Sequence, residues 1–382
     1  MALTTIQSNN KLIEFTRQIN REFVRENLFN PYMGDELNAI IRRRYEPKQG
    51  GEQMNVPIVT KLRNQAQGVG TLVGNEENVD NYGMRIWIDW ARNAVITNKA
   101  ECLKDSADLF GEFKPLLSNW GKELIRDEII AAFMALPSES APTLLGSAGG
   151  GRSNGIQFEA ATAAQKATWA NTDNLDRVVF GALLSNQNAT FATALGNCDT
   201  TNDIQGKSNL SLMKRMALNA SPAIRPYKTK DGYEYYVCFM GSNCFRDLKA
   251  DLVTVQTTAL QQMIKQSPLF QDGDLIWDGI IVRQVPEISG FVSDIWTTLL
   301  TAGASSTRVE PAFLCGQQSL TIAFGQMARP TVRKEDDYGF LQGVGVEMAY
   351  GTAKMFKKHP STGTALVQWG VVTHVAAAQA DG

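Results

Sequence analysis

The sequence predicts an α+β fold, and three features between residues 50 and 137 carry that prediction. Two segments in which apolar and polar residues alternate flank a polar, glycine-rich stretch, as in a long β-hairpin. One long segment follows in which apolar residues recur every three or four positions, as on one side of an amphipathic helix. No catalytic motif accompanies these elements, so the pattern indicates a protein that builds a structure.

The hairpin is predicted over about residues 50–98. Its first strand contains Pro57, which suits a sheet edge because proline has no N–H to give to a neighbouring strand. Its second strand, residues 84–90, alternates apolar and polar side chains in the same way. A two-stranded ribbon is marginally stable alone, so either the rest of the chain or a neighbouring copy covers its apolar face. The residues predicted to make this contact are Met54, Val56, Ile58, Ile86, Ile88 and Trp90.

The long helix has its apolar residues between Phe113 and Phe133. Pro115 is tolerated near the start of its main run, and Pro137 ends it. After the helix, residues 138–205 are rich in glycine, serine, alanine, asparagine and threonine, and few of them are charged. We expect an inserted region with short helices or strands there.

The remainder of the chain alternates between predicted strands and helices. The predicted strands are residues 235–240, 279–285, 312–314, 340–348 and 365–375. The predicted helices are residues 210–218, 245–259 and 319–327. The last of these helices is expected to pack on the strands around it.

An amphipathic helix is predicted near the N-terminus, over residues 11–29. Arg17, Arg21 and Arg25 recur every four residues on one side of it, and three more arginines follow at 42–44. Glutamates at nearby positions favour a solvated helix face. The alternative is a basic arm that contacts an acidic partner or packaged nucleic acid by neutralising its phosphates.

Composition and charge exclude several protein classes. The 382 residues are 43 % hydrophobic and 20 % charged, which is typical of a globular protein with two or three core-bearing regions. A formal charge of −2 gives no overall affinity for nucleic acid. The chain lacks an apolar signal core and any apolar run near the ~18 residues of a membrane span, so we expect a soluble, cytoplasmically made protein without a membrane partner. Five cysteines without a C-x-x-C pair predict reduced thiols.

The sequence offers little catalytic chemistry. Its two histidines, His359 and His374, and the absence of G-x-S-x-G and H-E-x-x-H motifs argue against a triad or a three-histidine zinc site. The best carboxylate cluster is Asp272, Asp274 and Asp278, which is either a plain turn or an oxygen-rich calcium or magnesium site. We therefore predict no catalytic, cofactor or metal residues. The rival hypothesis is a cytosolic α/β enzyme with a metal at these aspartates.

One set of segments resembles a known family. The run GTLVGNEE at residues 70–77, the alternating strand after it and the helix that closes at Leu136 resemble the major capsid proteins of tailed bacteriophages. The closest type is that of large-virion short-tailed phages, and residues 235–240 and 278–282 support the resemblance. The resemblance implies the Hong Kong-type capsid fold. Its parts would be an N-terminal arm (1–48), an extended loop (49–99), a peripheral domain with a spine helix and the Gly-rich insertion (100–224), an axial domain (225–335) and C-terminal strands that return to the peripheral domain (336–382).

The resemblance also implies a function. The chain would be a structural major capsid protein, not an enzyme, that self-assembles into the pentamers and hexamers of an icosahedral head enclosing double-stranded DNA. Its partners would be further copies of itself, a scaffolding protein, a portal, the packaged DNA and, where the shell carries one, a decoration protein. Assembly would take place in the host cytoplasm. Arg17, Arg21 and Arg25 would contact scaffold or DNA. A cellular nanocompartment shell of the same fold is a second alternative.

Overall fold

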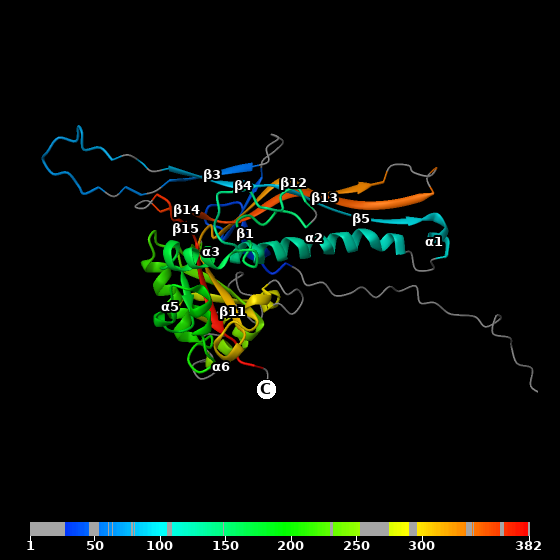
Figure 1. Cartoon of the computed structure of the whole chain (residues 1–382). Helices are drawn as coiled ribbons and strands as arrows, with labels where there is room; N and C mark the ends of the chain where they lie inside the picture. Colours follow the sequence, from blue (N-terminus) through cyan, green and yellow to red (C-terminus); the bar gives the residue numbers. More distant parts are fainter. Residues whose placement is uncertain are drawn as a thin grey trace, which may run out of the picture.

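The computed structural model has two larger β-sheets that meet at one long helix, and a hairpin that extends from the body (Figure 1). It describes residues 27–45, 53–59, 61–62, 64–77, 79, 81–104, 109–147, 149–229, 232–252, 275–289, 296–333, 338, 340–359 and 363–380.

The first sheet has five strands. In spatial order they are β1 (Met33–Gly34), β2 (Ile41–Tyr45), β12 (Leu320–Val332), β13 (Leu341–Lys354) and β5 (Asp89–Asn98). β12 and β13 pair antiparallel, β5 pairs antiparallel with β13, and β2 pairs parallel with β12. Segments nearly 300 residues apart in the sequence therefore share one sheet.

Helix α2 (Leu109–Met134) lies along one face of this sheet (Figure 1). Ile129 and Phe133 near its end are fully buried and belong to the same core as Tyr350 of β13. The long helix predicted from the three- and four-residue spacing is confirmed. It begins before the predicted run, so Pro115 lies inside it.

The second sheet has seven strands. Six of them follow the order β6 (Val178–Phe180), β16 (Val371–Ala377), β11 (Val309–Cys315), β8 (Glu234–Met240), β10 (Ile280–Gln284) and β9 (Leu275–Trp277), and β7 (Tyr227–Lys228) pairs with β8. β8 pairs parallel with β10 and antiparallel with β11, and β16 pairs antiparallel with β11.

Short elements complete the described fold. The remaining α-helices and small strands are α1 (Lys99–Lys104), α3 (Ala163–Ala167), α4 (Phe191–Gly196), α5 (Lys207–Asn219), α6 (Ser242–Leu252), β14 (Phe356–Lys358) and β15 (Leu366–Gln368). A π-helical turn, η3 (Thr168–Asp173), and five 3-10 turns are also present: η2 (Asn30–Tyr32), η4 (Leu184–Asn186), η5 (Pro286–Ser289), η6 (Thr297–Leu299) and η7 (Ala304–Ser306). The Gly-rich region thus holds short helices and a strand, as predicted. None of the helices in the described ranges is both long and apolar enough to span a bilayer.

Both faces of the second sheet are covered, which explains its unbroken apolar strands. Along β8, Val237 and Phe239 pack into the core shared with α2. Cys238 and Met240 pack into a second core on the other face, together with residues of α5 and α6. Successive side chains of a strand point to opposite faces, so a strand buried on both sides reads as a continuous apolar run.

The helix predicted over residues 319–327 is wrong, because most of these residues form the start of β12. Leu320 and Ile322 face the core shared with α2, whereas Ala323 faces a third core beneath the extended hairpin. Burial on both sides removes the alternation that identifies a strand. A short apolar run does not then distinguish a strand from a helix.

The C-terminal segment, residues 336–382, contributes strands to both sheets. β13 lies in the first sheet beside β12, whereas β16 lies between β6 and β11 in the second. All seven residues of β16 are buried. A strand without an outward face is stable in the interior of a sheet with both faces covered, which is where β16 lies.

Candidate inter-subunit surface

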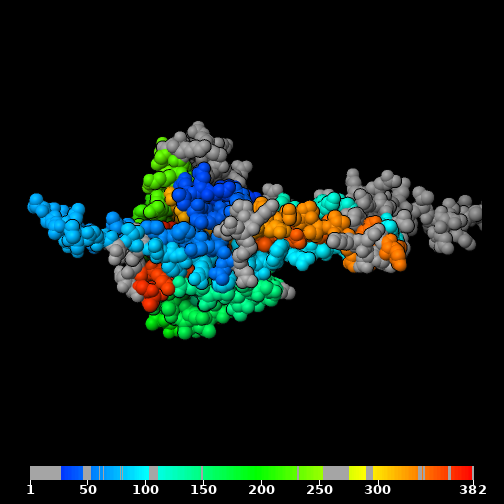
Figure 2. Space-filling view, turned by 90° about the horizontal axis from the view of Figure 1, so that it is seen from above, coloured from blue at the N-terminus to red at the C-terminus, as the bar shows by residue number. Residues whose placement is uncertain are grey.

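The predicted hairpin is formed by β3 (Gln53–Val59) and β4 (Asn81–Trp87), and the residues described between them project from one end of the molecule (Figures 1 and 2). The two strands pair antiparallel along their whole length. Among the strands that the structure describes, none adds to either edge of this ribbon. The described part of the connecting loop projects beyond the rest of the described chain at that end (Figure 1).

The apolar face of the hairpin is covered by the chain itself. Its residues, each at most 7 % exposed, are Met54, Val56, Ile58, Met84 and Ile86. They form a third core with Ala323, Met355 and Phe356. Of the two alternatives that the sequence left open, cover by the rest of the chain is correct for these residues. Little of their side-chain surface is exposed on the single chain, and their contact with a neighbouring subunit stays a prediction.

Trp90 differs from the other residues predicted on that face. β4 ends at Trp87 and β5 begins at Asp89, and the alternation changes phase between the two strands. Asp89 and Ala91 are buried, whereas Trp90 lies on the opposite side and is 50 % exposed. Ile88 at the junction is half-buried. Trp90 is therefore the one residue of the predicted six that keeps a large exposed surface.

Exposed apolar surface lies instead on the projecting loop and its ends. Its large apolar residues, each at least 56 % exposed, are Val59, Leu62, Val69, Leu72, Val73 and Val79. Single exposed apolar residues are ordinary, but a run of them on one projection marks an interaction site. Leu72 and Val73 lie within the GTLVGNEE run at residues 70–77, but none of these six side chains is among the residues predicted to contact a neighbouring copy. Their lack of cover is visible only in the folded chain.

The two glutamates of this loop bond to its own backbone. Glu76 Oε2 accepts a hydrogen bond of 2.7 Å from the Gly74 N–H, and Glu77 Oε2 accepts one of 2.9 Å from the Asn64 N–H. Gly74 has a φ of +85°, a conformation that favours glycine. These residues shape the tip of the loop and present its apolar side chains.

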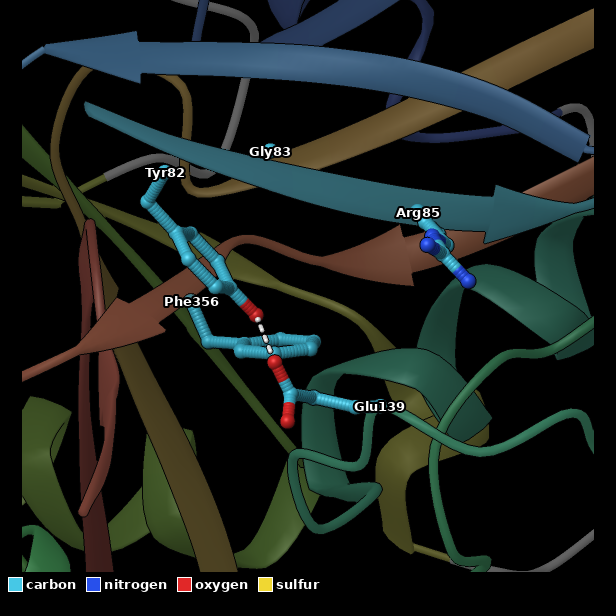
Figure 3. A pocket seen from close by; sticks show the side chains of 5 residues that line it. All are labelled: Tyr82, Gly83, Arg85, Glu139 and Phe356. Atoms are coloured by element: carbon cyan, nitrogen blue, oxygen red, sulfur yellow. Dashed lines mark hydrogen bonds between the residues drawn. The ribbon is translucent and has the colours of Figure 1, made fainter. Parts of the chain in front are cut away.

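A small pocket lies beside strand β4 of the hairpin (Figure 3). Its volume is about 230 Å³ and its lining consists of Tyr82, Gly83, Arg85, Glu139 and Phe356. The Tyr82 hydroxyl donates a hydrogen bond of 2.9 Å to Glu139 Oε1, and Lys358 Nζ lies 3.0 Å from Glu139 Oε2. Burial and the adjacent Glu139 carboxylate raise the pKa of Tyr82 well above its ordinary value. These contacts fasten β4 to the body of the subunit.

The candidate metal site gains no support from the part of it that is described. Asp278 pairs with Lys214 at 2.9 Å and has a φ of +51° in the turn before β10, while Asp272 and Asp274 lie outside the described residues. Within the described ranges, no three His, Cys, Asp or Glu side chains come together to hold a metal ion.

The two histidines belong to the body of the fold. His359 directly follows β14, and its backbone N–H donates to the Ala365 carbonyl at 2.8 Å. His374 is fully buried in β16, and its Nε2 donates to the Gly181 carbonyl at 2.9 Å. Burial lowers the pKa of His374 to about 4. Its imidazole is therefore neutral at pH 7 and supports the sheet.

The predicted basic arm, Arg17, Arg21 and Arg25, lies outside the described residues, so its contact with scaffold or DNA stays a prediction. Of the arginines that follow, Arg43 in β2 pairs with Asp35 at 3.3 Å.

Comparisons with known proteins show which proteins this chain is similar to. Residues 4–380 match a family model described as phage capsid protein. The chain is similar to a chain of the cyanophage Pam1 capsid asymmetric unit, at 30 % identity over 100 % of both chains with a TM-score of 0.80. It is also similar to the capsid of Ralstonia phage GP4, at 17 % identity over 100 % of both chains with a TM-score of 0.70. A third similar structure is the head of Helicobacter pylori bacteriophage KHP40, at 14 % identity over 97 % of this chain and 96 % of that one, with a TM-score of 0.63. No curated protein sequence matches the chain.

Proposed function

This chain belongs to the phage capsid protein family, and we propose that it assembles by placing the tip of its extended loop on a neighbouring copy. The observation that carries this proposal is the run of exposed apolar side chains on a loop that projects from the body (Figure 2). The apolar face of β3 and β4 packs against the body of its own subunit. The exposed apolar side chains of the loop are therefore the ones available to contact a neighbouring copy.

The fold is the Hong Kong-type capsid fold, and the protein is a structural major capsid protein of a bacteriophage virion. The rival hypotheses, a cytosolic enzyme and a cellular nanocompartment shell, have no support among these relatives. We propose further that the protein catalyses no reaction and that it assembles in the host cytoplasm.

The strength of one loop contact decides how assembly proceeds. Burying one valine or leucine side chain contributes about 1.5–3 kcal/mol, so three of them contribute roughly 5–9 kcal/mol. Association of two proteins costs roughly 4–15 kcal/mol in lost freedom. A single loop contact is therefore weak. In a closed ring each subunit gives one loop and receives another, and the closing contact carries no further association cost. We expect free subunits to be monomeric, and pentamers and hexamers to form cooperatively.

Further partners are proposed from the family and the sequence. A scaffolding protein, a portal, packaged double-stranded DNA and a decoration protein are the expected classes. Arg17, Arg21 and Arg25 are the proposed contacts to scaffold or DNA, because their four-residue spacing gathers positive charge on one side of a helix.

The test replaces two exposed loop residues together, Leu72→Asp and Val73→Asp. We expect a soluble subunit with an unchanged thermal unfolding transition that forms no shells with a co-expressed scaffolding protein, as seen by electron microscopy. Leu218→Asp, at a site that is 53 % exposed on α5, is the control for adding a charge to exposed apolar surface, and we expect it to assemble. Shells of normal diameter from the double variant would contradict the proposal.

A further inference from the structure

The hairpin leaves the first sheet at one residue, Trp87. The N–H of Trp87 donates a hydrogen bond of 2.8 Å to Asn154 Oδ1, and Asn154 Nδ2 donates one of 3.0 Å to the Trp87 carbonyl oxygen. One side-chain amide therefore occupies both backbone groups of this residue, as a neighbouring strand would. Asn154 is 7 % exposed, so these bonds are shielded from water and their loss is not made good by solvent.

Asn154 belongs to a short segment, residues 146–147 and 149–154, that we call the strap. The N–H of Asn154 donates to the Thr352 carbonyl at 2.7 Å, the N–H of Thr352 donates to the Arg152 carbonyl at 2.6 Å, and Ser153 pairs parallel with Thr352. β5 pairs with β13 only as far as Tyr350. Two residues further along β13, at Thr352, the strap pairs with the same edge of the strand. The hairpin therefore leaves the sheet at this point.

The strap also holds the chain beyond the junction. The Asp89 carboxylate accepts hydrogen bonds from the N–H groups of Gly146 at 2.9 Å and Gly151 at 3.1 Å. Burial of Asp89 raises its pKa, but these N–H groups, that of Trp90 and the Arg152 guanidinium together hold it below its ordinary value. Asp89 is therefore charged at neutral pH and binds the strap firmly.

Arg152 connects the strap to the spine helix. Its Nη1 donates to the Trp90 carbonyl at 2.9 Å, and its Nε donates to Glu128 Oε1 of α2 at 2.5 Å. The strap thus binds the residues on both sides of the junction, the edge of β13 and the side of α2.

Gly351 lies opposite the junction, where there is no space for a side chain. A Cβ on Gly351 of β13 would lie 2.0 Å from the Trp87 carbonyl oxygen. The hairpin backbone therefore crosses the sheet in contact with it. The third core holds β3 and β4 along their length, and the groups that bind Trp87 set the point and the angle at which the hairpin leaves the sheet.

We propose that Asn154 is a positioning residue for assembly: its amide fixes the direction in which the extended loop leaves the sheet, and hence where the loop tip meets a neighbouring copy. The inference rests on the proposed contact of the loop. A seven-residue strand spans roughly 20 Å, so a rotation of about 10° at its root moves its far end by about 3–4 Å. Such a displacement changes the angle between subunits and thereby the curvature of the shell.

The test compares shells formed by Asn154→Ala with those of the unchanged protein, both co-expressed with a scaffolding protein and imaged by cryo-electron microscopy. We expect Asn154→Ala to assemble, with a several-fold larger fraction of particles of aberrant diameter or open shape. Amide hydrogen exchange at Trp87 should accelerate.

The matched control is Asn174→Ala. Asn174 is also a buried asparagine, fully so, whose Nδ2 donates to the Trp169 carbonyl at 3.2 Å and whose Oδ1 accepts from the Gln368 N–H at 2.8 Å. Removing this amide lowers stability without touching the loop, so the shells should stay uniform.

Asn154→Asp provides the second variant if the alanine variant does not fold. It keeps the shape and the acceptor for the Trp87 N–H but sets a carboxylate oxygen against the Trp87 carbonyl, and we expect the same aberrant shells. Uniform shells from both Asn154 variants would overturn the inference. Failure of the loop contact itself would appear separately, as assembly of the Leu72→Asp, Val73→Asp protein.

Discussion

Lys354 Nζ donates a hydrogen bond of 3.0 Å to the carbonyl oxygen of Phe133, one residue before α2 ends. Lys354 is the last residue of β13 and is 3 % exposed. Its Nζ satisfies a terminal carbonyl of the helix and lies at the negative end of the helix dipole. This bond joins the end of the spine helix to the end of β13 in the first sheet.

The buried Lys354 gives stability a pH dependence. Burial lowers its pKa to about 7 from an ordinary value of 10.5. Between these values the unfolded chain binds more protons than the folded one, so the free energy of unfolding rises with pH through this window. Relative to Lys354→Met, the unchanged protein should gain about 2–3 kcal/mol between pH 7 and pH 9. Urea unfolding of both proteins at the two pH values measures this, and a constant difference would contradict it.

His374 makes the free energy of unfolding depend on pH in the acidic range. Its folded-state pKa of about 4 lies below the ordinary 6.5, so the unfolded chain binds a proton more readily as pH falls from 6.5 to 4. The folded state should lose about 3 kcal/mol over this window relative to His374→Gln, which can still donate to the Gly181 carbonyl. Denaturant unfolding of the two proteins at pH 6.5 and pH 4 tests this. Parallel loss in both would assign the acid sensitivity to other groups.

Ile86 is expected to matter for folding of the single subunit. Its side chain is fully buried in the third core, so Ile86→Asp places a charge there and should lower the free energy of unfolding by about 3–5 kcal/mol. Asn55→Asp, on the exposed face of the paired strand β3, is the control and should change it by less than about 1 kcal/mol. Denaturant titration of both variants gives the comparison. Equal stability of the Ile86 variant and the unchanged subunit would mean that the hairpin face is not covered.

Gly155 holds the Gly-rich region against the end of α2. Its φ is +93°, and a Cβ there would lie 2.5 Å from the Leu136 carbonyl oxygen. Gly155→Ala should therefore destabilise the subunit by about 2 kcal/mol or more. Gly196→Ala, at the end of α4 with open space around it, should leave stability unchanged or raise it by up to about 1 kcal/mol. Thermal unfolding of the pair checks this, and similar midpoints would contradict the strain at Gly155.

The sequence predicts the elements with one exposed face and misjudges those whose surroundings are distant in the chain. The hairpin and α2 follow from local periodicity, whereas β8, buried on both faces, is identified by its continuous apolar run. The cover over Ile86 comes from residues such as Phe356, which are 270 positions away and could not be assigned from a pattern. Trp90 continues the alternation of residues 84–88 in the sequence, but the strand break at Ile88 turns it to the other side. Asn154 carried no recognisable motif, because its role depends on a contact with the Trp87 backbone.

The order in which paired strands are synthesised determines when the subunit can complete its fold and associate with other copies. β2 pairs with β12, which the ribosome delivers about 280 residues later, and β6 pairs with β16, which follows it by about 190 residues. At roughly 5–20 residues per second, β2 waits tens of seconds for its partner. The cover for the hairpin, at residues 353–356, also emerges late. A nascent chain that already displays the loop therefore cannot yet hold it in place, so translation order delays association until the subunit is nearly complete.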